Sequence, residues 1–530
     1  MTSRISPLLT DRSQLLAALT RTEEVDVVVI GGGATGLGVA VDAASRGLSV
    51  VLLESHDFAK GTSSRATKLV HGGVRYLAQG NIALVREALH ERSVLLQNAP
   101  HLAAPLGFVM PSYKCWEMPF YGVGLKAYDT LAGKGGLGTT RFLSSRKAAE
   151  ALPGLKTQGL KGGVMYWDGQ FDDARLALAL ARTAAVHSAL LVNYCPVKEL
   201  IYEESKVAGV ICEDAESGEQ YTVRAKCVIN ATGVWVDAIR RMDSNHQKQA
   251  ADPIVSPSQG VHLVVDSHFL PGPHALLVPK TADGRVLFAV PWLGKVILGT
   301  TDTSRPDLAR EPEAYEEEIE FILRESANYL SSPPKRSDVR SIWVGLRPLV
   351  KTKNLKSSGG NTKSLSREHT ILSSSSGLVT VTGGKWTTYR SMAEDVLEHC
   401  VKEGVLGHLS PSITRRLRVV GAPNEEVNTA LYRAPNLTAY GTEADWVQSL
   451  PGVEREILPG LTEAMVRFAV RYEYARTVED ILARRSRWLF LDAESCLDAA
   501  PVVAEILETE GVSDPRLSEF LVLCMQYQCP

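Results

Sequence analysis

A glycine-rich turn joins an apolar run to a helix-like stretch near the start of the chain, in the sequence VDVVVIGGGATGLGVAVDAASRG of residues 25–47. The run VDVVVI is short, apolar and rich in β-branched residues, which predicts a buried parallel strand. Gly31 permits a tight turn, Gly33 lets the main chain approach a diphosphate, and Gly36 lets the next helix lie close to the strand. The pattern predicts a dinucleotide-binding unit, with a glycine-rich packing turn that binds no ligand as the alternative.

Glu54 ends the second apolar run, LSVVLLE, about twenty residues beyond the turn. A carboxylate at this place accepts hydrogen bonds from ribose hydroxyls, and it would repel a 2′-phosphate. The helix that follows the glycines directs its first N–H groups toward the phosphates. NADP is therefore disfavoured, but this unit alone does not separate NAD from FAD.

Length and composition exclude several classes of protein. A chain of 530 residues is too long for one core, so about two or three domains are expected. The net charge of -3, from 57 basic and 60 acidic residues, argues against a nucleic-acid binder. The eight cysteines form no C-x-x-C pair and no metal-ligand spacing with histidine, so no metal site is predicted and a reducing compartment is expected.

No secretion signal or membrane span is expected, because residues 1–24 contain no apolar signal core and no later run reaches about 18 apolar residues. Strand-like runs such as GVHLVVD, RVLFAV and KVILGTTD alternate with turn residues, as in an antiparallel sheet. A strand-to-helix return is predicted at 376–400, and helical periodicity dominates after residue 403. The Lys- and Ser-rich stretch 351–366 predicts an exposed loop.

The stretch SHDFAKGTSSRATKLVHGGVRYL, which follows Glu54, is too polar and glycine-rich for an ordinary crossover helix. Its Thr-Ser-Ser run and its His-Gly-Gly-x-Arg-Tyr motif resemble the flavin-dependent glycerol-3-phosphate dehydrogenases, which are grouped with D-amino-acid and sarcosine oxidases. YWDGQFDDARL, INATGVWVD, GLRPLV and VTGGKWTTYR are similar to further family motifs in the same order. The resemblance covers residues 25–400 and continues more faintly into the tail.

The resemblance implies an α/β fold with a Rossmann-type FAD-binding domain of the glutathione-reductase and D-amino-acid-oxidase kind, an antiparallel-sheet substrate domain and a C-terminal helical domain. It implies the following boundaries: FAD-binding parts at 20–110, 165–250 and 355–402, a cap or membrane-facing segment at 111–164, a substrate-binding sheet at 251–354, and a helical domain at 403–530.

FAD is the cofactor that the resemblance implies. The residues that it implies as FAD contacts are Gly31, Gly33, Gly36, Glu54, Thr62, Ser63, Ser64, Lys68, His71, Gly72, Val197, Thr232, Gly233, Gly383, Gly384, Lys385, Trp386 and Thr387. Independently of the family, the strands CVINATG and GLVTVTGG run into small-residue turns that let the main chain approach a ligand. The second turn opens a helix, so its N–H groups favour an anion. Plain structural turns are the alternative at both places.

The implied substrate, glycerol 3-phosphate, carries a dianionic phosphate and a secondary alcohol. Arg75, Arg347 and Lys385 lie in family motifs and are the predicted phosphate ligands, with Tyr76 and Thr388 as candidates for the hydroxyls. Outside such motifs, these cations would be interpreted as surface charges.

Loss of hydride from the C2 atom of the substrate requires a base for the hydroxyl proton. His71 is the first candidate and His262 the second, although a lone histidine is more often structural. The implied reaction transfers hydride to flavin N5 and releases dihydroxyacetone phosphate, and a membrane quinone reoxidises the flavin. An oxygen-using glycerol-3-phosphate oxidase, a related amine oxidase and a non-catalytic flavin-binding sensor are the alternatives.

Segment 111–138 interleaves aromatic residues with lysines, which suits either a bilayer interface or a cap over the active site. Five tail arginines, Arg471, Arg476, Arg484, Arg485 and Arg487, either bind lipid head groups or pair with Glu473, Glu479 and Asp480, and solvated pairing is favoured. The expected location is the cytoplasm, peripheral on the inner face of the membrane. No D-x-D-x-D-G loop occurs, so calcium control is not expected. A homodimer is considered as the assembly and stays open.

Overall fold

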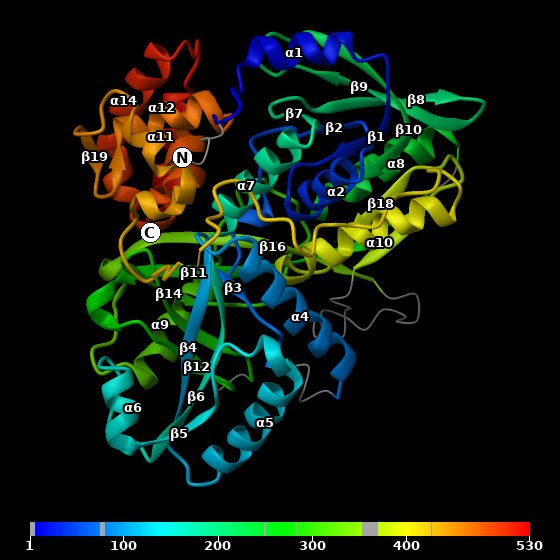
Figure 1. Ribbon diagram of the computed structural model, residues 1–530. Coiled ribbons are helices and arrows are strands. Elements are labelled where there is room, and N and C mark those ends of the chain that lie inside the picture. Colours follow the sequence, from blue (N-terminus) through cyan, green and yellow to red (C-terminus); the bar gives the residue numbers. More distant parts are fainter. Residues whose placement is uncertain (1–5, 75–79, 249–250, 282–283, 352–368, 426) are drawn as a thin grey trace.

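The structure is a computed structural model that describes residues 6–74, 80–248, 251–281, 284–351, 369–425 and 427–530. Figure 1 shows two sheets and a C-terminal helical region in orange and red. Within the described residues, no helix is long and apolar enough to cross a membrane. The predicted α/β fold is confirmed.

The glycine-rich turn follows β1 (Glu24–Ile30), an inner strand of the first sheet, which has eight strands. The strands neighbour one another in the order β17 (Thr370–Ser373), β18 (Val379–Thr382), β10 (Gln220–Asn230), β1, β2 (Val50–Leu53) and β7 (Leu190–Val192). A hairpin, β8 (Val197–Glu203) and β9 (Lys206–Glu213), extends from β10. Since β1 pairs in parallel with both β10 and β2, the predicted buried parallel strand is confirmed.

Alternate side chains of β1 point to opposite faces of the sheet. Val27 and Val29 pack with α2 (Ala34–Ser45), α7 (Asp173–Val186) and α10 (Tyr389–Lys402). The intervening residues pack toward the β8–β9 hairpin, α1 (Arg12–Arg21) and α8 (Val236–His246). Burial on both faces explains the nearly all-apolar sequence of the strand.

The second sheet has ten strands and is antiparallel except where β12 pairs with β4. Along its main path the strands are β15 (Thr303–Ser304), β11 (Val255–Asp266), β14 (Lys295–Gly299), β13 (Leu287–Trp292), β12 (Ala275–Val278), β4 (Ala103–Ser112), β6 (Gly162–Phe171) and β3 (Leu69–Val70). The strand β16 (Val339–Val350) pairs with β11, and β5 (Arg141–Ser144) pairs with β6.

The predicted boundaries need correction at this sheet. The prediction confines it to 251–354, but β3 and β4 come from the part assigned to FAD binding at 20–110, and β5 comes from the segment 111–164. The strands that meet at β4 and β12 are far apart in sequence, and local alternation carries no information about which strands pair.

Helices cover both faces of the second sheet. One face packs against α6 (Ser145–Ala151) and α9 (Glu316–Tyr329). The other packs against α4 (Ile82–Asn98), α5 (Glu117–Ala132) and the C-terminal helices. The segment 111–138 therefore folds as the end of β4 and the helix α5, joined to the sheet rather than separate from it.

The predicted helical tail is confirmed from Leu437 onward, whereas the described residues of 403–436 form turns and irregular structure, which corrects the predicted start of the tail. It consists of α11 (Ala444–Gln448), α12 (Glu463–Tyr472), a π-helix (Asp480–Arg485), α13 (Trp488–Leu491), α14 (Ala493–Thr509) and α15 (Leu517–Tyr527), with a hairpin of β19 (Glu456–Leu458) and β20 (Leu461–Thr462). The periodic sequence that continues beyond α12 is interrupted after Tyr472, because Tyr474 adopts φ +60°.

The tail arginines are paired, but three of them are buried rather than solvated, which corrects the prediction. The Asp57 carboxylate accepts hydrogen bonds from Arg484 and Arg485, which are 2% and 1% exposed in their side chains. Arg487 is buried beside Asp173, 3.0 Å away. The alternative in which these three arginines bind lipid head groups is therefore wrong.

The other two tail arginines lie nearer the surface. Arg471 pairs with Glu510 at 2.6 Å, and Arg476 pairs with Glu216 at 2.7 Å. Both partners lie outside the nearby carboxylates that the sequence analysis considered. Local pairing is confirmed for Arg484, which lies 2.6 Å from both Glu479 and Asp480, whereas Arg471 and Arg476 pair with carboxylates of other elements.

Replacing Asp57 with alanine should lower the free energy of unfolding by about 3–5 kcal/mol, because two guanidinium groups then stay buried without their shared carboxylate. Urea or thermal unfolding measures the change. Burial alone raises the pKa of Asp57, but Arg485 and Arg484 lower it below 3.8 overall. The carboxylate therefore stabilises the fold fully above pH 3.8, and this contribution is lost as the pH falls through the lowered value.

The control is Glu203→Ala, which breaks the exposed pair with Arg224 and should cost no more than about 1 kcal/mol. Equal unfolding free energies of Asp57→Ala and the unsubstituted protein would contradict the importance of the buried pairs.

Candidate active site

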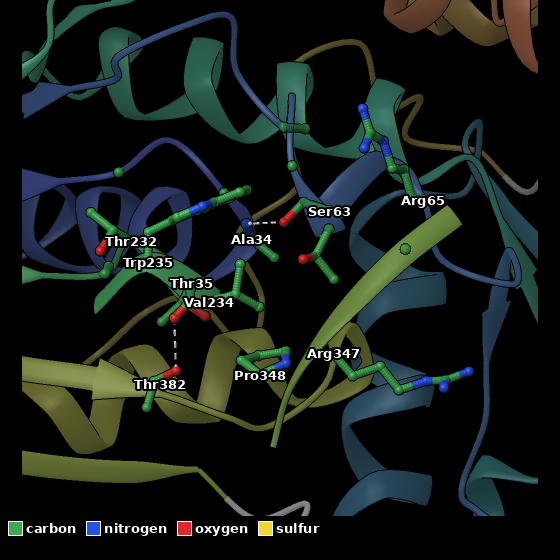
Figure 2. A pocket seen from close by; sticks show the side chains of 18 of the residues that line it. Ala34, Thr35, Ser63, Arg65, Thr232, Val234, Trp235, Arg347, Pro348 and Thr382 are labelled. Carbon is green, nitrogen blue, oxygen red and sulfur yellow. Dashed lines mark hydrogen bonds between the residues drawn. The ribbon is translucent and has the colours of Figure 1, made fainter. Parts of the chain in front are cut away.

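A cavity of about 550 Å³ lies where the carboxyl ends of β1, β10 and β18 meet β11 and β16 of the second sheet. Ligands of α/β sheets bind outside the carboxyl ends of parallel strands. Figure 2 shows the side chains that line this cavity, with Thr232 and Thr382 on the side of the first sheet and Arg347 on β16. The cavity therefore lies between the two sheets.

The glycine turn has the geometry that its sequence predicts. Gly31 adopts φ +109°, and a Cβ atom there would lie 2.8 Å from the Ala231 carbonyl oxygen. A Cβ atom on Gly36 would lie 1.9 Å from the Gly31 carbonyl oxygen, so the helix lies directly against the turn. Gly31 and Gly33 line the cavity, whereas Gly36 packs behind them. This cradle of main chain fits a diphosphate group.

Ser63 joins this cradle at the N-terminus of α2. Its Oγ atom accepts a hydrogen bond from the Ala34 N–H group at 2.9 Å, drawn in Figure 2. Thr62 also lines the cavity, and its hydroxyl donates to the Leu346 carbonyl oxygen at 2.6 Å. These bonds hold the loop between the first sheet and β16.

Glu54 is held at the wall by the main chain. Its Oε2 atom accepts from the Gly32 N–H group at 2.6 Å, and its Oε1 atom accepts from the His56 N–H group at 2.9 Å. Val197, at the start of β8, lines the same side. The carboxylate is therefore oriented before a ligand arrives.

The other two turns also border the cavity. Thr232 and Gly233 follow β10, and the Gly233 carbonyl oxygen accepts from the Thr382 hydroxyl at 3.0 Å (Figure 2). After β18, Gly383 and Gly384 adopt φ +83° and +72°. Lys385, Trp386 and Thr387 continue along the wall, and the Trp386 indole N–H donates to the Ser63 carbonyl oxygen at 2.8 Å.

Besides Gly36, four predicted residues lie behind the wall, and Lys68 is the clearest correction. Its ammonium group is fully buried, 2.7 Å from both the Asp173 carboxylate and the Ser64 carbonyl oxygen. Burial lowers its pKa to about 7, and the field of Arg487 acts in the same direction. The charge of Asp173 opposes this shift without cancelling it. Its basic side chain therefore serves a buried ionic cluster and does not reach the cavity.

The remaining three are Ser64, Gly72 and Thr388. The Ser64 side chain is buried, and a Cβ atom on Gly72 would lie 2.5 Å from the Tyr128 hydroxyl of α5, so this glycine permits packing. The Thr388 hydroxyl donates to the Lys385 carbonyl oxygen at 3.3 Å as α10 begins. Arg75 and Tyr76 lie outside the described residues.

Arg347 lines the cavity from β16 and is oriented by the segment that follows β14. Its guanidinium donates to the Thr301 carbonyl oxygen at 3.0 Å and to the Thr300 hydroxyl at 3.2 Å, and it lies 3.3 Å from Asp302. Lys385 lines the cavity from the first sheet. The structure thus brings two of the three predicted phosphate ligands to one cavity.

Both candidate bases line the cavity as well. His262, on β11, is buried, its Nε2 atom lies 2.9 Å from the Thr67 hydroxyl, and its ring stacks on Trp343 at 4.0 Å between centroids. Burial, followed by the charges of Arg347 and Lys68, lowers its pKa well below 6.5. His262 is therefore neutral at pH 7. His71 lines the wall near Thr387, whose hydroxyl accepts from its N–H group at 3.3 Å.

Among the described residues that line the cavity, none comes from 111–138, so the cap interpretation of that segment is not supported. The cavity also contains residues that the sequence analysis missed, namely Lys60, Arg65, Thr67, Trp235 and Arg310. The first four lie inside or beside recognised motifs, so the sequence could have identified them. Arg310 lies in an irregular connection, and no local signal identifies it.

Comparisons with known proteins agree with this geometry. The sequence model of the family described as FAD dependent oxidoreductase matches residues 26–390, and that of the C-terminal domain of alpha-glycerophosphate oxidase matches residues 351–515. The chain is 42% identical to the mitochondrial glycerol-3-phosphate dehydrogenase of Rattus norvegicus, over 94% of this chain and 72% of the relative. It is 39% identical to that of Arabidopsis thaliana, over 95% of this chain and 86% of the relative.

Two solved structures share the fold. The glycerol-3-phosphate dehydrogenase of Bacillus halodurans, complexed with FAD, superposes with a TM-score of 0.76 at 29% identity, over 97% of this chain and 96% of that one. The FAD-bound L-alpha-glycerophosphate oxidase of Mycoplasma pneumoniae superposes with a TM-score of 0.57 at 15% identity, over 78% and 98%.

Proposed function

Because the chain belongs to the FAD-dependent oxidoreductases, and among them to the glycerol-3-phosphate dehydrogenases, we propose that it oxidises sn-glycerol 3-phosphate to dihydroxyacetone phosphate and passes the electrons to a membrane quinone. The observation that carries this proposal is the convergence of the three cofactor turns, Arg347, Lys385 and two histidines on one cavity.

The cofactor site is formed by residues whose geometry fits FAD. Gly31, Gly33 and Ser63 would hold the diphosphate, Glu54 would bind the ribose hydroxyls, and the turn at Gly383 and Gly384 would hold the flavin end. When bound, FAD supplies the hydride acceptor at N5 of its ring.

The substrate phosphate binds Arg347 and Lys385, with Arg75 as the third predicted ligand. The Thr301 carbonyl oxygen accepts from both terminal nitrogens of the Arg347 guanidinium and fixes its direction, while Asp302, 3.3 Å away, offsets part of its charge. Because an anion gains most from cations that are already oriented, this arrangement favours binding of the phosphate over binding of neutral glycerol.

His262 is the better supported of the two bases. Its Nε2 atom is held by Thr67, Trp343 packs on its ring, and burial together with the nearby Arg347 lowers its pKa and keeps it neutral. A dianionic phosphate bound at Arg347 offsets that positive charge, so substrate binding raises the proton affinity of the imidazole when it is needed. The C2 hydroxyl proton passes to this ring as the C2 hydride leaves.

The helix α5 supports a peripheral contact with the membrane that holds the quinone. Trp116, just before the helix, and Phe120 and Val123 on it are 56%, 66% and 70% exposed, while Leu125 and Tyr128 of the helix are buried. Exposed aromatic side chains near Lys114 and Lys126 suit a bilayer interface. We place the protein on the inner face of the cytoplasmic membrane, and cosedimentation with phospholipid vesicles tests the contact.

Anaerobic addition of glycerol 3-phosphate should bleach the visible absorbance of the purified flavoprotein, whereas glycerol should bleach it far more slowly. A soluble quinone should then restore the absorbance. Rapid reoxidation by air with peroxide release would instead favour an oxidase, the activity named in the second matching family. A yellow protein that glycerol 3-phosphate leaves unbleached would be a non-catalytic flavin-binding protein.

Replacing Arg347 with alanine should raise the KM for glycerol 3-phosphate at least about tenfold, because a lost charged hydrogen bond costs about 1.5–3 kcal/mol. Steady-state kinetics measures this change. The KM of Arg347→Lys should lie between the KM of Arg347→Ala and that of the unsubstituted protein. Arg324→Ala, an exposed change on α9, is the control and should leave KM unchanged. An unaltered KM in Arg347→Ala would remove this arginine from the phosphate site.

Replacing His262 with asparagine should lower kcat by about 10²–10⁴-fold while the flavin spectrum is retained. Because the pKa of the free-enzyme imidazole is lowered, protonation at this site should not reduce kcat/KM until the pH falls well below 6.5. The pH profile is corrected for ionisation of the substrate phosphate. His71→Asn is the matched variant, and a larger loss of kcat there would assign the base to His71.

A further inference from the structure

The segment 308–311, which leads from the second sheet toward α9, crosses to the FAD-binding part of the molecule. The Trp235 indole N–H donates to the Leu308 carbonyl oxygen at 3.0 Å, and Arg65 donates to the Arg310 carbonyl oxygen at 2.9 Å. Trp235 ends the 3-10 turn Gly233–Trp235 that follows β10, and Arg65 follows the loop that carries Ser63. The segment is therefore tied to two walls of the cavity, and we call it the strap.

The strap carries one acidic residue, Glu311, that neutralises nearby cations. Its carboxylate lies 2.7 Å from Arg65 and 2.8 Å from Lys60, and Lys60 also pairs with Glu479 at 2.5 Å. Both cations line the cavity, but their charges are compensated by carboxylates. Neither therefore offers an uncompensated positive charge to a bound anion.

Arg310 lies in a different environment on the same strap. Its guanidinium carbon is 3.8 Å from the centroid of the Trp235 indole ring, and the residue lines the cavity. Among the described residues, no salt bridge joins it to a carboxylate; burial lowers its pKa, and the charge of Glu54 opposes this shift without cancelling it. Stacking on Trp235 holds the guanidinium at the cavity mouth while leaving its N–H groups in the plane of the group available to an anion.

Trp235 connects this guanidinium to the diphosphate cradle. A Cβ atom on Gly61 would lie 2.9 Å from the Trp235 ring, and two residues later Ser63 contacts the first turn of α2. The cradle itself offers neutral N–H and hydroxyl groups and the helix N-terminus. A cation that faces the cradle would therefore stabilise the two negative charges of a diphosphate bound there.

We propose that Arg310 binds the FAD diphosphate, so that the strap of the second sheet closes over the cofactor that the first sheet holds. The proposal rests on the FAD dependence of the family and not on the identity of the substrate. Arg310 acts here as a cofactor ligand, and the strap makes the second sheet part of the cofactor site.

Arg310→Met keeps an apolar side chain over Trp235 and removes the charge. In the full-length protein, stripped of flavin and titrated with FAD while flavin fluorescence is followed, this variant should raise the Kd for FAD at least about tenfold. Riboflavin has no diphosphate, so its Kd should stay unchanged. Arg310→Lys should retain part of the FAD affinity, and the salt dependence of FAD binding should be weaker in Arg310→Met than in the unsubstituted protein.

Arg433→Met is the matched control, because Arg433 is an exposed arginine stacked on Tyr432 in the C-terminal part of the chain. It should leave the FAD affinity unchanged. Equal FAD affinity of Arg310→Met and the unsubstituted protein would overturn the proposal, and so would an equal loss of FAD and riboflavin affinity. Both measurements omit glycerol 3-phosphate, so a failure of the proposed substrate would show separately as an absence of bleaching.

Discussion

The Ser64 carbonyl oxygen accepts hydrogen bonds from two fully buried cations, Lys68 and Arg487, at 2.7 Å each. Both cations share the Asp173 carboxylate, and Asp57, which precedes the Ser63 loop in the chain, holds two further arginines of the C-terminal π-helix. Buried charges of this kind are tolerated only when they are paired, because their desolvation costs several kcal/mol for each ion. The loop that carries Ser63 is therefore held by Lys68, by Asp173 at the start of α7 and by Arg487 of the C-terminal part.

The position of that loop determines the position of the cavity. On one side it contacts the N-terminus of α2 through Ser63, and on the other it contacts β16 through Thr62. The parallel sheet contributes the main-chain cradle for the cofactor, and the second sheet contributes Arg347 and His262. A substrate that must meet both a redox ring and fixed cations thus binds between the sheets, where neither sheet alone would provide a complete site.

Much of the cofactor site could be predicted, because its chemistry depends on main-chain geometry. Gly31 and Gly36 carry a local signal: no other residue fits the contacts that they make, and their spacing from the apolar strand reveals this. The cations were harder to predict. Lys68 and Arg347 both lie in matching motifs, yet one is buried against Asp173 and the other lines the cavity. Lys68 and Arg347 carry the same charge and both lie in recognised motifs. Only the carboxylate and aromatic side chains around them distinguish the buried cation from the one that lines the cavity.

The sequence by itself determined the parallel strand, the glycine turn, the acid at Glu54 and the helical tail, because each depends on residues that are close together in the chain. Only the tertiary structure decided which strands form the second sheet, which arginines are buried, and that Arg310 of an irregular connection reaches the cavity. These features depend on contacts between distant segments. The energy of a strand pair or an ion pair depends on both partners. The local sequence around one partner is therefore not enough to predict the pair.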